Sequence, residues 1–207
     1  METEPLARPE APRPRDFGDV LRSRRSGLAG PVGWTEVAGL LWHAAGIQDR
    51  APSGRAGIPV ERRASPSAGG LHPIHLVCIN GDGDGRVRLY DAHDHAFHVL
   101  DVDHEDVSAK NAAVVGEILG ASRGCTLRLV ADVGKVEAAY ENPESLVLRD
   151  AGCVVAVLCL CAEWLGLTAC PLGFLGDELL AALDFPGPRF RALGAVQITA
   201  PVDPSGP

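Results

Sequence analysis

Hydrophobic side chains recur along the chain with two kinds of spacing, which predict two kinds of element. Apolar residues three and four positions apart, clearest at Val37, Leu40, Leu41 and Ala44, are typical of one helix face. The predicted helices are 17–24, 35–45, 107–119 and a short one at 177–183. Continuous or alternating apolar runs predict strands at 74–79, 126–133 and 194–199, and a hairpin of 86–91 with 96–101. Helices mixed with a few non-adjacent strands predict an α+β fold with a central sheet.

The most clearly signalled helix runs from Asn142 to about Leu165. Asn is a favoured N-cap, Pro143 suits the first helical position, and Glu144 complements the helix dipole. The middle of this segment is apolar on every side, so we expect it to lie in the centre of the fold. Its uninterrupted apolar run, 151–162, is too short to cross a bilayer.

Length and composition predict one soluble domain. The chain has 207 residues, of which 46% are hydrophobic and 22% are charged. Residues 1–15 are rich in proline and mixed charges, so we expect a disordered arm before a domain at 16–200. A flexible tail is expected at 201–207 and a mobile loop at 48–57. The N-terminus lacks the apolar region of a secretory signal.

The net charge and the cysteines limit which partners and which cellular compartment the sequence predicts. The formal net charge of −8 disfavours nucleic acid and anionic membranes as partners. The six cysteines form no CxxC, so we interpret them as buried side chains of a cytoplasmic protein. Histidines and aspartates alternate over 91–104, but their spacing matches no standard metal site, and no metal is expected.

Three short segments carry residues that suit a flat, phosphate-bearing ligand. RSRRS at 22–26 offers guanidinium and hydroxyl donors for phosphate oxygens. RASPSAGG at 63–70 is rich in small residues that let the backbone approach a ligand closely. CPLGF at 170–174 follows the long helix and predicts a turn with an available N–H group. Alone, the three segments are more typical of a solvated basic patch, a plain loop and a turn, respectively.

Together, in this order and spacing, the segments resemble the nitroreductase superfamily of FMN-dependent oxidoreductases. The most similar branch is the SagB-type dehydrogenases, which oxidise azolines to azoles in peptide natural products. The resemblance covers about 16–199. Its matching strings are RRS, TEVAGLLWHAAGI, RRASPSAGGLHPIHLVCIN, VRLYDAHDHAFHVL, RDAGCVVAVLCLCAEWLGL and CPLGF. PSAGG followed by LHP, at this distance after RRS, is the most specific of them.

The resemblance implies a nitroreductase-like α+β fold, with a mostly antiparallel sheet flanked by helices, in a homodimer that holds two FMN molecules at the subunit interface. Three sets of residues match FMN-binding positions: Arg24, Arg25 and Ser26 near the phosphate; Pro66, Ser67, Ala68 and Gly69 in a loop that meets the isoalloxazine from the partner subunit; and Leu172 and Gly173 in a turn whose N–H approaches flavin N5. The implied chemistry is hydride transfer to or from N5, which the flavin carries while the protein orients it.

Three departures from the SagB-type pattern bear on the chemistry. These enzymes generally have a Lys-Tyr pair before the central helix that removes a substrate proton. Tyr140 matches the tyrosine and is the candidate catalytic residue, but Ala139 stands in the lysine position, with Lys135 as an alternative. Cys153 stands where the usual histidine would be, and the chain ends in PVDPSGP, where many relatives have a basic residue.

The sequence thus predicts a cytoplasmic FMN-dependent dehydrogenase or oxidase that acts on a peptide-derived substrate such as an azoline. One alternative is an NAD(P)H-dependent reductase of nitro compounds or quinones with the same flavin. A second alternative is a catalytically lapsed subunit that only binds a biosynthetic partner protein, which the missing lysine and the missing basic residue at the C-terminal end favour.

Overall fold

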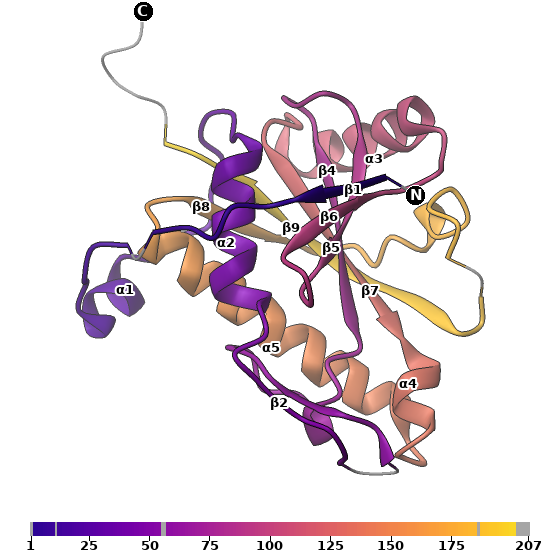
Figure 1. The fold of residues 1–207 in the computed structure, drawn as a ribbon. Coiled ribbons are helices and arrows are strands. Elements are labelled where there is room, and N and C mark those ends of the chain that lie inside the picture. The colour runs from indigo at the N-terminus through magenta and orange to yellow at the C-terminus, as the bar shows by residue number, and fades with distance from the viewer. Residues whose placement is uncertain (1, 11, 55–56, 186, 202–207) are drawn as a thin grey trace, which may run out of the picture.

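A seven-stranded antiparallel sheet organises the molecule, in the order β1-β6-β5-β4-β7-β9-β8 (Figure 1). The computed structural model describes residues 2–10, 12–54, 57–185 and 187–201. The strands are β1 (Glu2–Pro5), β4 (Ile74–Asn80), β5 (Val87–Asp91), β6 (Ala96–Val99), β7 (Cys125–Asp132), β8 (Thr168–Leu172) and β9 (Phe190–Thr199). A separate two-stranded hairpin pairs β2 (Asp49–Ala51) with β3 (Val60–Arg62).

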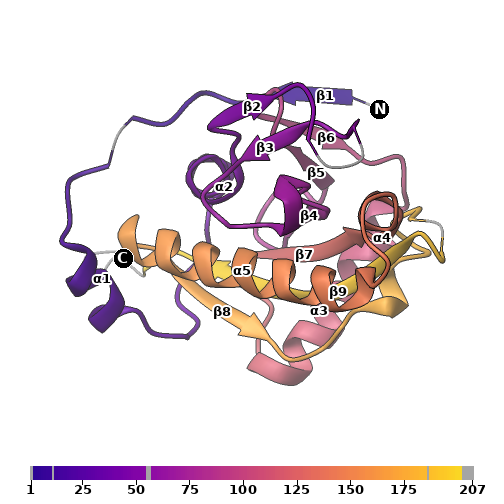
Figure 2. The same cartoon turned by 90° about the horizontal axis from the view of Figure 1, so that it is seen from below.

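Helices cover both faces of the sheet (Figures 1 and 2). They are α1 (Phe17–Ser23), α2 (Trp34–Ala45), α3 (His104–Leu119), α4 (Val133–Glu137) and α5 (Pro143–Trp164), with short 3-10 turns η2 (Ala68–Gly70) and η3 (Asp177–Leu179). α2 and α5 pack on one face, where Leu41 and Leu158 join Leu127 in the larger core cluster. α3 and η3 pack on the other face, in a second cluster. The predicted α+β class and antiparallel sheet are confirmed.

α5 lies on the surface of the sheet rather than in the centre of the fold, so the prediction of a central helix is wrong. Leu158 is fully buried against the sheet, whereas Leu148 is 53% exposed and Gly152 and Ala156 are exposed on another side. Among the described helices, α5 is long and apolar enough to cross a membrane by length and composition alone. A soluble core helix also meets that criterion, and α5 has a bare apolar face in a single chain.

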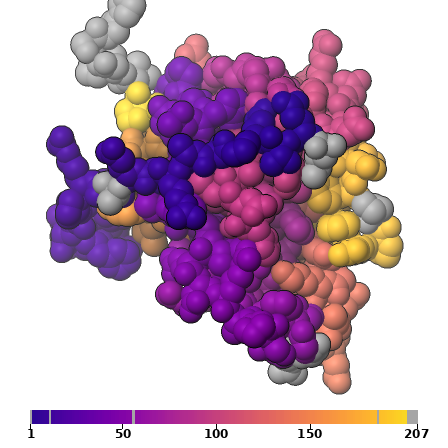
Figure 3. Space-filling view, in the orientation of Figure 1, coloured from indigo at the N-terminus to yellow at the C-terminus, as the bar shows by residue number. Residues whose placement is uncertain are grey.

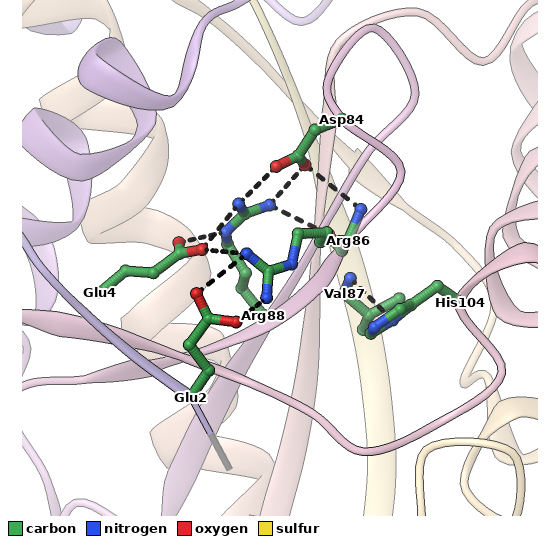
Figure 4. Close-up of polar contacts among 7 residues, drawn as sticks. All are labelled: Glu2, Glu4, Asp84, Arg86, Val87, Arg88 and His104. Carbon is green, nitrogen blue, oxygen red and sulfur yellow. Dashed lines mark hydrogen bonds and ion pairs between the residues drawn. The ribbon is translucent and has the colours of Figure 1, made fainter.

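The predicted disordered arm is wrong over residues 2–5, which form the edge strand β1 beside β6. Figure 4 shows the ion-pair cluster that holds this strand. Glu4 accepts from Arg88 Nε at 2.7 Å and from Arg86 Nη1 at 2.9 Å. Asp84 accepts from Arg88 Nη2 and Nη1 at 2.6 and 2.7 Å. Such charge-assisted pairs are stronger than neutral hydrogen bonds. Glu2 and Glu4 of the arm therefore hold β1 through ion pairs, which hydrophobic patterning cannot predict.

The rest of the arm runs across the α2 side of the molecule towards α1, as Figure 3 shows in indigo. The Arg8 guanidinium lies 5.2 Å from the ring centroid of Trp42, and Pro9 approaches Gly39. Of the tail predicted over 201–207, only Pro201 lies within the described residues.

Three short strands depart from the predictions made for their segments. β2 lies inside the segment predicted as a mobile loop, and its partner β3 was not predicted. β8 includes Cys170 to Leu172, which were predicted to form a turn, so the bend begins only at Gly173. Each of these strands is short, and its pairing partner, not its own pattern, decides its conformation.

Candidate functional site

Arg24 and Ser26 line an open pocket of about 400 Å³ against α5 (hereafter the Arg24 pocket). Its other walls are Gly152, Val155, Ala156, Cys159, Leu160 and Pro171. Arg24 caps the C-terminal end of α1, and its Nη1 donates to Ser26 Oγ at 3.4 Å. Gly152 and Ala156 leave room on this face of α5 beside a guanidinium, an arrangement that suits an anionic ligand with a planar part.

Arg25, the third residue predicted for the phosphate, points elsewhere. Its Nη1 donates to the carbonyl oxygens of Arg22 and Arg24, at 2.7 and 2.8 Å, and its side chain is exposed outside the pocket lining. The structure therefore brings Arg24 and Ser26 to the pocket, and leaves Arg25 bracing the chain that carries them.

Gly173 follows Pro171, a wall of the Arg24 pocket, at the end of β8. It is exposed, and a Cβ built on it would meet no atom within 4 Å, so its backbone faces open space. Leu172 is 7% exposed and packs with Val115 and Ala195 in a third apolar cluster. Leu172 therefore anchors the bend, while Gly173 leaves room for a ligand above it.

The predicted loop of Pro66, Ser67, Ala68 and Gly69, which we call the PSAG loop, is fixed by a residue that the sequence analysis missed. Asp150 on α5 accepts from Ser67 Oγ at 2.5 Å and from the Ala68 N–H at 3.2 Å. Ser67 Oγ in turn accepts from the His72 N–H at 2.9 Å. Asp150 is only 5% exposed, and a carboxylate inside an apolar helix was the signal that could have revealed it.

Tyr140 lies directly against the PSAG loop. A Cβ built on Gly69 would lie 2.7 Å from the Tyr140 hydroxyl, and Gly69 has a φ of 60°. Glycine tolerates both the left-handed backbone and this close approach. Tyr140 also lines an open hollow of about 630 Å³ with Glu137, Asn142 and Leu146. The structure thus joins two predicted site residues that are distant in sequence.

Lys135 does not take the place of the lysine that is missing beside Tyr140. Lys135 lies on α4 and lines a different cavity, with His72 and His75, whereas Tyr140 faces the larger hollow. Burial holds the pKa of Lys135 below its ordinary value, while the Glu61 carboxylate opposes that shift. Cys153, which replaces the usual histidine, is half-buried on α5.

The two groups of predicted residues lie on opposite sides of α5. Gly152, Val155, Ala156 and Cys159 face the Arg24 pocket, whereas Asp150 holds the PSAG loop. At about 100° per residue, from 3.6 residues per turn, Asp150 points nearly opposite to that face. In one chain, therefore, Arg24 and the PSAG loop are separated by the helix and cannot both contact one small ligand.

The histidines of the 91–104 segment each have a separate protein partner. His98 Nε2 lies 3.1 Å from Asp91 Oδ2, His95 Nδ1 lies 3.0 Å from the Tyr90 hydroxyl, and His104 Nδ1 accepts from a backbone N–H at 3.2 Å. Over the part of the chain that the structure describes, no three His, Cys, Asp or Glu side chains are grouped to hold a metal ion.

Solved structures share this fold at low sequence identity. A protein from Ralstonia eutropha JMP134 assigned to the nitroreductases aligns with a TM-score of 0.76 and 19% identity, over 98% of this chain and 91% of that chain. One from Desulfovibrio desulfuricans, crystallised in complex with FMN, aligns with a TM-score of 0.59 and 19% identity, over 94% and 91%. The E. coli microcin synthetase McbBCD complex, with truncated pro-MccB17 bound, gives 0.67 and 18%, over 96% of this chain and 77% of that chain.

Sequence comparison identifies the family of this chain, but not a branch within it. A search among curated proteins finds no match to this chain. The sequence profile described as "Nitroreductase family" matches residues 31–183, which is most of the chain and spans the PSAG loop, α5 and Gly173. With the fold and this match together, the chain belongs to the nitroreductase family.

Proposed function

We propose that this protein is an FMN-dependent oxidoreductase whose flavin sites form between two copies of the chain. The observation that carries the proposal is the Arg24 pocket, where a guanidinium and a hydroxyl lie beside a mostly apolar face of α5 that includes Gly152 and Ala156. Open space over Gly173 and Gly152 fits the planar ring system of FMN, and Arg24 fits its phosphate. FMN, when bound, supplies hydride transfer at its ring.

The residues of this chain would bind and orient the cofactor and handle a proton at the substrate. Arg24 and Ser26 would hold the phosphate, and the Gly173 backbone would face the ring. The PSAG loop, fixed by Asp150, would cover the ring of the partner's site. Tyr140, whose hydroxyl lies against Gly69, is our candidate for moving a proton at the substrate.

Two features support a homodimer. Arg24 and the PSAG loop lie on opposite sides of α5, so a two-fold axis is the simplest way to bring one copy's arginine to the other copy's loop. The apolar face of α5 around Leu148, Gly152 and Ala156 is also exposed in the single chain, as expected of a surface that a second copy buries.

For the substrate, we propose oxidation of a peptide-derived molecule such as an azoline, as in SagB-type enzymes. The fold similarity to a microcin synthetase complex with truncated pro-MccB17 bound supports this choice, and with it a biosynthetic partner protein. We also propose that the protein is cytoplasmic. Removing two hydrogens requires a base as well as a hydride acceptor, and we assign the role of base to Tyr140, whose hydroxyl lies against Gly69.

Ala139 favours a second candidate, an NAD(P)H-dependent reductase of nitro compounds or quinones. Such a reaction needs no lysine to remove a substrate proton, and that lysine is missing here. The reagent that bleaches the flavin distinguishes the two candidate functions. Bleaching by NAD(P)H supports the reductase, whereas bleaching by a heterocyclic peptide, with oxygen restoring the colour, supports the dehydrogenase. A colourless protein without bound flavin would instead support the lapsed, partner-binding subunit.

The phosphate assignment is tested by flavin occupancy after purification. Arg24→Gln removes the charged donor from the pocket, and we expect flavin affinity to fall about tenfold or more, because a charge-assisted hydrogen bond contributes about 1.5–3 kcal/mol. Arg22→Gln, an exposed neighbour paired with Asp19, is the matched control and should keep wild-type occupancy. Equal occupancy in the wild type and both variants would remove Arg24 from the site.

A further inference from the structure

A second cavity, away from the Arg24 pocket, opens where β4 and β5 separate. The β4–β5 ladder ends at the Val77–Leu89 pair, whereas β4 continues to pair with β7 back to Ile74. Residues of α2, β4, β5, β6 and α4, together with connecting loops, line the resulting space of about 230 Å³, which we call the Lys135 cavity. Small-molecule sites for drug-sized ligands begin near 300 Å³, so this volume suits a ligand of only a few heavy atoms.

The carboxylates around the Lys135 cavity are already occupied. Glu61 accepts from Arg63 Nη2 at 2.5 Å and its other oxygen lies 3.1 Å from His93 Nε2. Asp91 accepts from the His93 N–H at 2.7 Å and lies 3.1 Å from His98 Nε2.

Asp132, at the start of α4, is occupied in the same way. It accepts two nitrogens of Arg189, at 2.9 and 2.6 Å, and the Lys135 N–H at 3.2 Å. The acceptors near the cavity are thus used by other donors.

The hydrogen-bond donors that line the Lys135 cavity are less fully paired than the carboxylates around it. Within the described residues, neither the Lys135 ammonium nor the His75 ring has a hydrogen-bond or ion-pair partner, although both line the cavity. The His75 ring only packs against Phe185 and Phe190, at centroid distances of 6.4 and 6.2 Å. A half-buried ammonium without an acceptor is costly unless something supplies one.

Part of the remaining wall is apolar, where Ala45, Ile74, Leu76 and Leu89 contribute hydrocarbon surface. The other polar side chains of the lining, among them Arg63, His72 and His98, have protein partners of their own. A ligand that fits must therefore combine one anionic group with a short apolar part. A metal ion does not fit, since the described histidines and acids of this region form no group of three ligands.

We propose that the Lys135 cavity binds a short aliphatic carboxylate, whose carboxylate pairs with the Lys135 ammonium and whose hydrocarbon part lies against Ile74, Leu76 and Leu89. His75 donates to the second carboxylate oxygen. This site does not depend on the flavin chemistry, because the cavity shares no lining residue with the Arg24 pocket.

The ionisation of Lys135 gives the site a direct readout. Burial holds the pKa of Lys135 below its ordinary value, with Glu61 opposing and Arg63 reinforcing the shift. A carboxylate bound to the ammonium stabilises the charged form and must raise that pKa. The chain has only two lysines, Lys110 and Lys135, so both side-chain signals can be followed separately by NMR after labelling lysine with ¹³C.

The experiment titrates the full-length labelled protein with butyrate, its uncharged isostere butyramide, and inorganic phosphate. We expect butyrate to shift the Lys135 signal saturably and to move its titration midpoint to higher pH, while Lys110, paired with Asp106 on α3, stays unchanged. Butyramide should have no effect. A shift with butyramide equal to that with butyrate, a response to phosphate alone, or no saturable response would overturn the proposal.

Calorimetry on variants provides a second test. Lys135→Met keeps most of the side-chain volume and removes the charge, so butyrate affinity should fall about tenfold or more. Lys110→Met removes the other lysine from an exposed position and should leave the affinity unchanged. Equal butyrate affinity in the two variants would contradict the assignment, and the wild-type titration decides the matter if Lys135→Met does not fold.

Discussion

At the scale of single residues, Asp150 determines the conformation of the PSAG loop. Its carboxylate accepts from the Ser67 hydroxyl and the Ala68 N–H, and Ser67 passes the restraint on to the His72 N–H. Gly69 and Gly70 follow with φ values of 60° and 65°, and the only regular structure in the loop itself is the short 3-10 turn η2. One buried acid on α5 therefore holds a segment that lies far away in sequence.

We expect Asp150→Ala to destabilise the protein by about 3 kcal/mol, because it leaves a buried N–H unsatisfied and removes charge-assisted hydrogen bonds. Urea unfolding measures the loss, and hydrogen exchange at Ala68 should quicken. Arg149→Ala, its exposed neighbour on α5, is the control and should change stability by less than about 0.5 kcal/mol. Equal effects of the two substitutions would show that the carboxylate does not hold the loop.

At the scale of elements, the sequence predicts the segments that carry their own pattern, including the short hairpin of β5 and β6, and misses the strands that depend on a pairing partner. α2, α3, β4 and β7 carry their own periodicity or apolar runs, and the structure confirms them within a few residues. β1, with the sequence ETEP, carries no apolar signal, and only its pairing with β6 and its ion pairs make it a strand. β8 ends in Pro171 and Leu172, which read locally as a turn but pair with β9.

The prediction for α5 fails for a different reason. Its apolar composition predicted burial on every side, but the sheet buries only one side, and the small residues on another side remain exposed. Composition cannot tell whether the chain itself or a second copy covers a helix face. The candidate site shows the same limit of sequence-based prediction. Arg24, Ser26 and Gly173 could be found by motif, whereas finding Asp150 required knowing what α5 faces.

A pair of substitutions within the N-terminal arm tests whether the ion pairs of Glu4 hold β1 against the sheet. Glu4→Gln removes the charge that meets Arg86 and Arg88, and we expect a loss of about 2 kcal/mol in the free energy of unfolding. Glu10→Gln makes the same charge change at an exposed position and should be neutral. Hydrogen exchange in β1 should rise only in Glu4→Gln. If both variants matched the wild type in both measurements, the ion-pair cluster would not be what holds the strand.

At the scale of the whole molecule, the fold separates two half-sites that the proposed chemistry needs together. α5 acts as the divider, with Arg24 and Gly173 towards one side and the PSAG loop with Tyr140 towards the other. A two-fold dimer would form each complete site from the arginine side of one copy and the loop side of the other. Substitutions on the two sides should therefore complement each other between subunits.

Mixing two variants that are each expected to lose flavin tests this arrangement. Homodimers of Arg24→Gln lack the phosphate donor at both sites, and homodimers of Asp150→Ala lack an ordered loop at both sites. A mixed dimer has one site with both defects and one site with none, because the intact Arg24 and the intact loop come from different copies. Random reassortment makes about half of the dimers mixed, so about a quarter of wild-type flavin occupancy should return. Occupancy is read from flavin absorbance after the two variants are unfolded and refolded together, and each variant refolded alone is the control. If each site instead lay within a single chain, the mixture would hold no more flavin than the average of the two variants.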